Sequence, residues 1–144
     1  MNVELDKQLL ITVDNKVGTL AELTSIIAAS GINLIAMCAY AVENQGVIMF
    51  VCNNSEQAKK LLKARGYDIR EEDVVLISLD NKPGALQTVT QHIADAGIDL
   101  TLLYGSVDKT GKVTRVVLVS EDNKAVATAL KVMSLPGSAR LHSS

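Results

Sequence analysis

Two short loops of nearly the same sequence carry the residues best suited to bind a small charged molecule. They read Asp-Asn-Lys-Val-Gly at residues 14–18 and Asp-Asn-Lys-Pro-Gly at residues 80–84. Each loop precedes a segment with helical apolar spacing, and the free N–H groups and dipole of a helix N-terminus favour an anion such as a carboxylate. The Asn side chains can donate to a carboxylate or accept from an ammonium group. Gly18 and Gly84 allow a ligand to approach the backbone closely.

The same loops also have a purely structural interpretation. Asp, Asn and Gly are common in turns that bind no ligand, and Asp80 or Asn81 could cap the helix that begins near Pro83. Thr19 and Glu22 have the spacing of a capping box. On residue spacing alone, both interpretations stay open.

Other candidate chemistry is sparse. Cys38 and Cys52 would face each other across a three-residue turn at 44–46, as a redox or metal-binding pair, but we interpret them as small buried residues of a reduced protein. His92 and His142 lack the spacing of metal ligands. The sequence shows no serine–histidine–acid set and no phosphate-binding glycine loop. We therefore expect no catalytic residues, no metal and no cofactor.

Composition argues against several classes of protein. The 144 residues include 14 Lys and Arg against 16 Asp and Glu, so there is no basic excess to attract nucleic acid. The longest apolar run, residues 34–42, is about half the length of a membrane span. The N-terminal residues lack the basic and apolar regions of a signal peptide. We expect a cytoplasmic protein with neither a membrane nor a nucleic-acid partner.

The two loops belong to an internal repeat. Residues 13–34 and 79–100 align at an offset of 66, and half of the aligned positions are identical, far more than chance gives. The identical pairs are Asp14/Asp80, Asn15/Asn81, Lys16/Lys82, Gly18/Gly84, Leu20/Leu86, Thr24/Thr90, Ile27/Ile93, Ala28/Ala94, Gly31/Gly97, Ile32/Ile98 and Leu34/Leu100. The chain is therefore a duplication of a unit of roughly 70 residues, and we expect domains at 1–72 and 73–144.

Each unit has the predicted order strand–helix–strand–strand–helix–strand. We expect strands at 8–13, 32–43, 47–52 and 67–70 in the first unit and at 74–79, 98–107, 113–120 and 139–142 in the second. Helices should end at Gly31 and Gly97, and further helices should lie at about 55–65 and 122–133. With right-handed crossovers this order gives the α+β class: two ferredoxin-like units, each an antiparallel sheet with two helices on one face. The linker Glu71-Glu72-Asp73 is short.

Strand parity predicts an apolar face beyond the core. In the first unit, the core face would carry Leu34, Ala36, Cys38 and Tyr40, and the opposite face Ile35, Met37, Ala39, Ala41, Val47, Met49 and Val51. In the second unit, the core face would carry Ile98, Leu100, Leu102 and Tyr104. Because helices cover only one face of a sheet, an apolar second face predicts association, most simply as a homodimer.

Both units resemble ACT domains, the small ligand-sensing modules attached to enzymes of amino-acid metabolism. The strongest match is D-N-K-P-G-A-L at 80–86 followed by A-D-A-G-I-D-L at 94–100, which is similar to the H/D-x-N-x-P-G-x-L … G-x-N-I pattern of the serine-sensing domain of phosphoglycerate dehydrogenases. The segment L-P-G-S-A-R-L at 135–141 resembles the last helix, turn and strand of that domain. The resemblance covers nearly the whole chain and implies an amino acid bound between two copies.

The resemblance also assigns the site residue by residue. The family's loop Asn corresponds to Asn15 and Asn81, and its Asn at the start of the second strand corresponds to Asn33 and, changed, to Asp99. The expected ligand-binding residues are Asn15, Lys16, Val17, Gly18, Asn33, Leu34, Asn81, Lys82, Pro83, Gly84, Asp99 and Leu100, with the loop of one copy meeting the second-strand start of another. Val13 and Leu79 replace a polar residue of the dehydrogenases, which removes a side-chain contact to serine.

These observations favour a regulatory protein that binds a free amino acid and modulates a separate enzyme of amino-acid metabolism. One alternative is a small enzyme of ferredoxin-like fold, although the loops lack an Arg for phosphate. A second is an RNA-binding domain with the same element order, whose aromatic residues would be Tyr40, Phe50 and Tyr104. A third is a structural dimerisation module.

Overall fold

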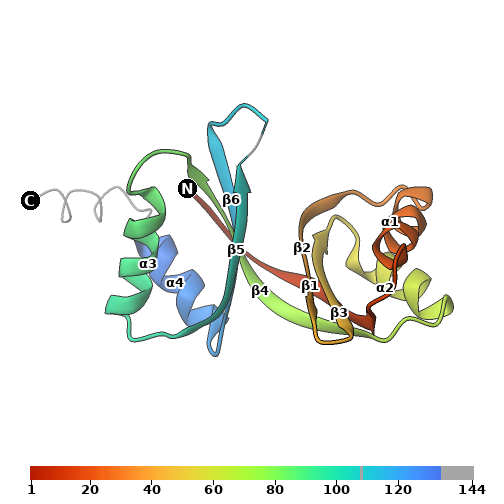
Figure 1. Cartoon of the computed structure of the whole chain (residues 1–144). Helices are drawn as coiled ribbons and strands as arrows, with labels where there is room; N and C mark the ends of the chain where they lie inside the picture. The colour runs from red at the N-terminus through yellow and green to blue at the C-terminus, as the bar shows by residue number, and fades with distance from the viewer. Residues whose placement is uncertain (108, 134–144) are drawn as a thin grey trace, which may run out of the picture. The chain divides into compact units, whose positions relative to one another are not determined.

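The computed structural model describes residues 1–107 and 109–133 (Figure 1). The elements are β1 (Asn2–Asp14), α1 (Thr19–Ala29), β2 (Leu34–Val42), β3 (Gln45–Cys52), α2 (Ser55–Ala64), β4 (Ile69–Asp80), α3 (Ala85–Asp95), β5 (Leu100–Val107), β6 (Val113–Ser120) and α4 (Asn123–Met133). The strands follow the order β2-β3-β1-β4-β6-β5 in one antiparallel sheet. The α+β, tandem ferredoxin-like class predicted from the sequence is confirmed.

The chain divides into two units, and the two longest strands contribute to both. The first unit is Lys7–Glu72, and the second combines Met1–Asp6 with the described residues from Asp73 onward. Within the first unit, α1 and α2 lie on one face of the strands, and within the second, α3 and α4 do so (Figure 1). The first residues of β1 therefore belong with the second half of the sequence.

Each unit has its own apolar core between its helices and its strands. The buried residues of the helices are Leu23 and Ile27 in α1, Ala58 and Leu62 in α2, Val89 and Ile93 in α3, and Val126, Ala127 and Leu130 in α4. Their spacing of three or four residues gives each helix one apolar face. Leu20 and Leu86 continue the same pattern but are 43% and 40% exposed. Each lies in a first helical turn, and Leu20 borders a cleft beside the loop after β1.

A β-bulge corrects the predicted strand faces. Leu34 pairs with Cys52, but Ala36 pairs with Val51, so the register shifts between Leu34 and Ala36. The shift turns Ala36, Cys38 and Tyr40 away from the core, whereas Met37 packs against it. The same shift occurs between Leu100 and Leu102 in the second unit, at the same offset of the repeat. Strict alternation was therefore the wrong assumption, because a bulge adds one residue and reverses the parity that follows it.

The hairpin register also separates the two cysteines. β2 and β3 are joined by residues 43 and 44 rather than by a three-residue turn, because Val42 pairs with Gln45. Cys38 consequently pairs with Met49 on the face turned from the core, while Cys52 is buried in the core of the first unit. Neither Cys38 nor Cys52 forms a disulfide bond. The pairing of Cys38 with Cys52 considered above is wrong.

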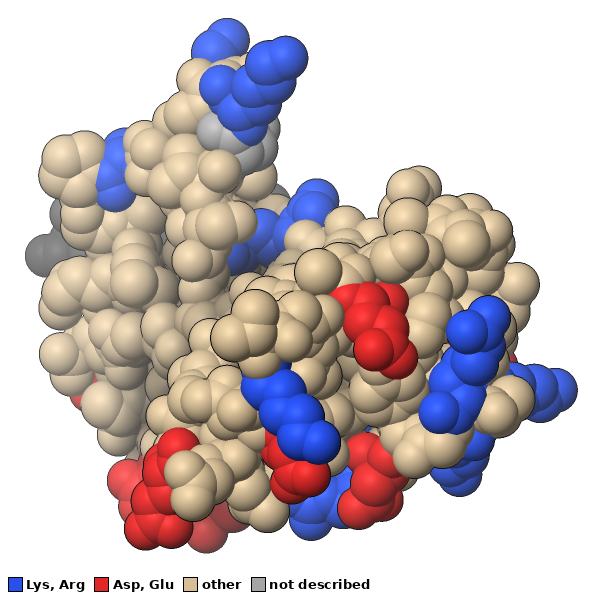
Figure 2. All heavy atoms as spheres, turned by 45° about the vertical axis from the view of Figure 1, so that its right-hand side comes forward, with Lys and Arg blue, Asp and Glu red and all other residues tan. Residues whose placement is uncertain are grey.

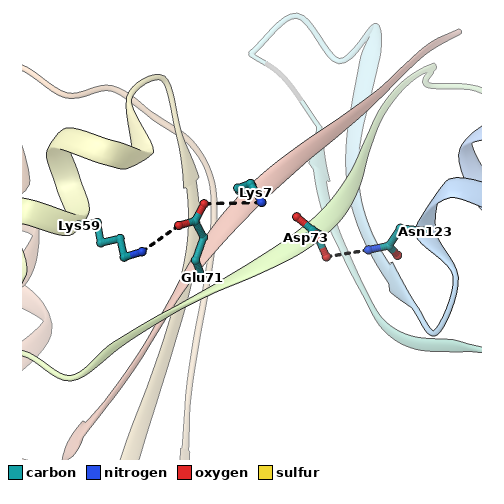
Figure 3. Close-up of polar contacts among 5 residues, drawn as sticks. All are labelled: Lys7, Lys59, Glu71, Asp73 and Asn123. Carbon is teal, nitrogen blue, oxygen red and sulfur yellow. Dashed lines mark hydrogen bonds and ion pairs between the residues drawn. The ribbon is translucent and has the colours of Figure 1, made fainter.

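Residues 71–73 form part of β4 and do not act as a linker. The predicted strands at 67–70 and 74–79 are one strand, Ile69–Asp80. Glu71 accepts from the Lys59 ammonium at 3.1 Å and lies 3.8 Å from that of Lys7 (Figure 3). The Asn123 amide donates to the Asp73 carbonyl oxygen at 2.8 Å, within the second unit (Figure 3). These partners hold a run of acidic residues in an extended strand.

The second unit takes a strand from the N-terminus of the chain. The sheet neighbour of β4 opposite β6 is β1, and Val3 packs against the core of the second unit. The strand predicted at 139–142 lies outside the described residues.

Candidate functional site

The loop between β1 and α1 is tied to the adjacent hairpin through its backbone. The Asn15 N–H donates to the Asn44 carbonyl oxygen at 2.8 Å, and the Thr19 N–H donates to the Lys16 carbonyl oxygen at 3.3 Å. Gly18 is the N-cap residue of α1 and has φ of 89°, in the left-handed region. A side chain at this position would strain the backbone, so the glycine fixes how the loop enters the helix.

No side chain caps α1, and this leaves donors free at its N-terminus. The Glu22 N–H donates to the Gly18 carbonyl oxygen at 2.9 Å. In the described part of the chain, no partner accepts from the backbone N–H groups of Leu20 and Ala21, and none bonds to the Asn15 side-chain amide. The capping box of Thr19 and Glu22 is therefore wrong. These donors lie at the positive end of the helix dipole, where an anion is favoured.

A cleft of about 350 Å³ borders these donors, near the lower limit for small-molecule sites. It opens between the start of α1 and the β2–β3 hairpin. Its lining residues are Val13, Asp14, Asn15, Lys16, Gly18, Thr19, Leu20, Ala21, Ala39, Tyr40, Ala41, Gly46, Val47 and Ile48. The charged side chains among them are Asp14 and Lys16, and the others are mostly apolar. The cleft thus joins hydrogen-bond donors and one charge of each sign to an apolar wall.

A second, more polar cleft of about 470 Å³ lies on the other side of the same loop. Its lining residues are Thr12, Val13, Asp14, Lys16, Thr19, Gln45, Gly66, Tyr67 and Asp68. The Tyr67 hydroxyl donates to the Glu22 carboxylate at 3.0 Å. The pKa of the Tyr67 phenol is raised above its usual value, and the largest cause is the partial burial of the side chain. The hydrogen bond to Glu22 and the negative charge of Glu22 raise it further. This bond ties the first turn of α1 to the segment that follows α2.

In the loop after β4, the matching Asn has a structural role. The Asn81 side-chain amide donates to the Gly111 carbonyl oxygen at 2.8 Å, and the Thr114 hydroxyl donates to the Asn81 side-chain oxygen at 3.2 Å. Its backbone N–H donates to the Lys112 carbonyl oxygen at 2.7 Å. Gly84, with φ of 86°, is the N-cap of α3, so neither Asp80 nor Asn81 caps this helix. The β5–β6 hairpin therefore fixes the Asn81 amide.

The hairpin residue opposite each loop explains the difference between the two Asn side chains. In the first unit Val13 pairs with Gly46, and in the second unit Leu79 pairs with Thr114. Gly46 has no side chain to offer Asn15, whereas the Thr114 hydroxyl reaches Asn81. The sequence alone does not reveal that Gly46 and Thr114 occupy matching positions, because the hairpins differ in length and the offset of 66 no longer aligns them. The apolar wall formed by Ala39, Ala41 and Ile48 depends on the pairing register of β2 with β3, which the sequence does not show.

The predicted site residues do not all meet within one unit. Asp14 pairs with Gln45 at one end of β3, whereas Leu34 pairs with Cys52 at the other end, so Asn33 and Leu34 lie far from the loop at 15–18. The same holds in the second unit for Leu100, which pairs with Ser120 while Asp80 pairs with Val113. Among the loop residues, Asn15, Lys16, Val17 and Gly18 are exposed, as are Asn81, Lys82, Pro83 and Gly84.

Two features argue against an RNA-binding surface. Phe50 is fully buried in the first core, and Tyr40 and Tyr104 lie on β2 and β5, at the edges of the sheet. Figure 2 shows acidic and basic side chains interspersed over the lower part of the face that it presents, so this part of the surface is not a continuous basic patch. Among residues 1–107 and 109–133, no group of three or more His, Cys, Asp or Glu could hold a metal ion.

Comparison with known proteins assigns the family. The model of the ACT domain pair matches residues 4–134. The chain belongs to the ACT domain pair family. No curated protein matches the chain. In the described residues, no helix is long and apolar enough to cross a membrane.

Several solved structures are similar to this chain. Protein BT0572 from Bacteroides thetaiotaomicron is 30% identical over 92% of this chain and 90% of that chain, with a TM-score of 0.84. The ligand-free regulatory subunit of aspartate kinase from Thermus thermophilus is 16% identical over 94% and 99% of the two chains, with a TM-score of 0.66. The corresponding subunit from Thermus flavus is 16% identical over 91% and 94%, with a TM-score of 0.61. At 16% identity the kinase subunits share the fold.

Proposed function

We propose that this ACT domain pair is a non-catalytic regulatory module that binds a free amino acid at the loop after β1 and modulates a separate enzyme of amino-acid metabolism. The observation that carries the proposal is the set of free donors, the Asn15 amide and the N–H groups of Leu20 and Ala21, beside a cleft of about 350 Å³. An amino acid's carboxylate matches these donors. Structural similarity to regulatory subunits of aspartate kinase supports a regulatory role.

The carboxylate would lie against the start of α1, and the ammonium group against Asp14. Lys16 adds a positive charge on the carboxylate side. Each charge of the ligand then has an opposite charge or a donor within one cleft, and this offsets the loss of water on binding. A ligand that holds one arrangement of the protein more tightly than another changes the population of that arrangement, which makes binding a signal.

We further propose that the protein acts as a homodimer and that a second copy of the chain supplies Asn33 and Leu34 to complete the site. Those residues lie at the far end of β2 from their own loop, and Leu34 is 38% exposed. A second site in the other half of the chain stays a prediction. Its residues would be Asn81, Lys82, Pro83, Gly84, Asp99 and Leu100. The number of ligands bound per chain distinguishes one site from two.

The first experiment is calorimetry of the full chain against the twenty amino acids and against the amine made by decarboxylating the best ligand. We expect one amino acid to bind and its amine to bind at least tenfold more weakly, since the amine lacks the group that the helix terminus holds. Equal affinity for the two compounds would contradict the carboxylate position.

A complementation experiment tests the second copy. Asn15→Ala and Asn33→Ala chains should each bind weakly, but a mixture of the two should regain tight binding at a fraction of the sites, because mixed dimers contain one intact site. The matched control is a mixture of Asp99→Ala and Asn15→Ala chains. This mixture should bind as much ligand as its Asp99→Ala chains bind alone, with no additional intact sites. No regain of binding in the first mixture, with dimers shown by sedimentation, would rule out the shared site.

A further inference from the structure

We infer that the cleft beside the loop after β1 selects amino acids with an uncharged aliphatic side chain. This inference rests on the proposed function, because it names the ligand class of the same site. It comes from the residues that form the cleft wall and from the number of charges that the cleft holds.

The charges in the cleft match the two charges common to all amino acids. Asp14 and Lys16 are the charged side chains among the lining residues, and they have opposite signs. Once the ligand's ammonium faces Asp14 and its carboxylate faces Lys16 and the free N–H groups, no charged lining side chain is left over. A third ligand charge would lose water without gaining a partner, which is unfavourable.

The remaining wall is apolar and leaves space for a side chain of modest size. On the sheet side, Ala39 pairs with Ile48 and Ala41 pairs with Gly46, at the edge strand. Ile48 is 4% exposed and forms part of the first core, and Leu20 approaches from α1. The small residues Ala39, Ala41 and Gly46 keep this corner open, and the aliphatic side chains around it favour methylene and methyl groups.

The polar cleft on the other side of the loop is a poorer location for this side chain. It is lined by Thr12, Gln45, Tyr67 and Asp68, which would suit a hydroxyl or a charge. However, Asn15, Leu20 and Ala21 line only the apolar cleft. A ligand bound through the free donors therefore directs its side chain to the apolar wall.

Calorimetry of the full chain with matched ligands tests the ligand class. We expect affinity to rise about fourfold per methylene from alanine through 2-aminobutyrate to norvaline. Valine should bind at least tenfold more tightly than threonine, its isostere with a hydroxyl, and than aspartate or lysine. If threonine, aspartate or lysine binds more tightly than valine, and Asn15→Ala weakens that binding, the aliphatic class is wrong but the proposed function holds. If no amino acid binds, both are wrong.

A pair of variants tests the wall itself. Ala41→Asp places a carboxylate on the apolar side of the cleft and should weaken valine binding at least tenfold. Val107→Asp is the matched control, because Val107 pairs with Thr114 as Ala41 pairs with Gly46; it should leave valine binding unchanged. Equal affinity for valine in Ala41→Asp and the native chain, with both variants folded by circular dichroism, would overturn the inference.

Discussion

The loops after β1 and β4 share four of five residues, yet their asparagines have different surroundings. The Asn81 amide is bonded to Gly111 and Thr114 of the β5–β6 hairpin, whereas the Asn15 amide has no partner among the described residues. The backbone bond from each Asn to its hairpin is the same in both units. The difference comes from the hairpin opposite, which offers Gly46 in one case and both the Gly111 carbonyl and the Thr114 hydroxyl in the other. A loop motif therefore indicates where a ligand could bind, and the neighbouring hairpin determines whether its donors are available.

Asn15→Ala should produce the largest effect. Removing a hydrogen bond to a charged ligand group should weaken valine binding about ten- to a hundredfold, or roughly 1.5–3 kcal/mol. The free energy of unfolding should change by less than about 0.5 kcal/mol, since the amide makes no bond in the unliganded protein. Calorimetry and urea denaturation measure the two quantities on the same sample. A large loss of stability would show that Asn15 is structural like Asn81.

Asn81→Ala should give the opposite result. The loss of two hydrogen bonds to the β5–β6 hairpin should lower the free energy of unfolding by about 1–2 kcal/mol. Valine affinity should stay within about twofold of the native value, with one ligand per chain. If Asn81→Ala removes one of two bound ligands, the loop after β4 is a second site and the two loops are equivalent after all.

Exchanging the hairpin residues should convert one loop toward the other. A Thr hydroxyl at position 46 would donate to the Asn15 side-chain oxygen, as the Thr114 hydroxyl does to that of Asn81, and would hold the amide in one orientation beside the hairpin. Because the amide then turns toward the ligand less freely, Gly46→Thr should weaken valine binding about fivefold, or about 1 kcal/mol. The new Cβ would lie 3.3 Å from Val13 Cγ2, which a small shift of that methyl relieves. Gly46→Ala is the control that adds the Cβ without the hydroxyl. Equal losses in both variants would assign the effect to steric crowding.

Tyr67→Phe should give the smallest effect, and it depends on pH. The raised pKa of Tyr67 means that the folded protein holds the phenolic proton more tightly than the unfolded chain does. Its contribution, about 0.5 kcal/mol for the bond to Glu22, is complete below the unfolded pKa of about 10 and is lost as pH rises through the folded pKa. Urea denaturation at pH 8 and above pH 10 should show the difference between native and Tyr67→Phe proteins shrinking. A constant difference would contradict the role of the phenolic proton.

The repeat was sufficient to predict the fold, and the hairpins limited the prediction of the site. Apolar spacing in the helices and the glycines at 31 and 97 predicted the helices well, because these signals are local. The bulges after Leu34 and Leu100 reverse which residues of β2 and β5 face the core, and no residue type in these strands indicates a bulge. The difference between Asn15 and Asn81 depends on residues about 30 positions away, in the register of another strand. Such pairing cannot be calculated from one strand's own residues.

The assignment of Met1–Asp6 to the second unit has a consequence for protein engineering. A piece beginning at Asp73 contains the second copy of the repeat but lacks the strand segment that carries Val3 into its core. Cutting the chain at the repeat boundary therefore yields a first fragment with an unsupported N-terminal extension and a second with an open sheet edge, which invites aggregation. To express the second unit by itself, residues 1–6 would have to be joined to the rest of that unit in a rearranged chain.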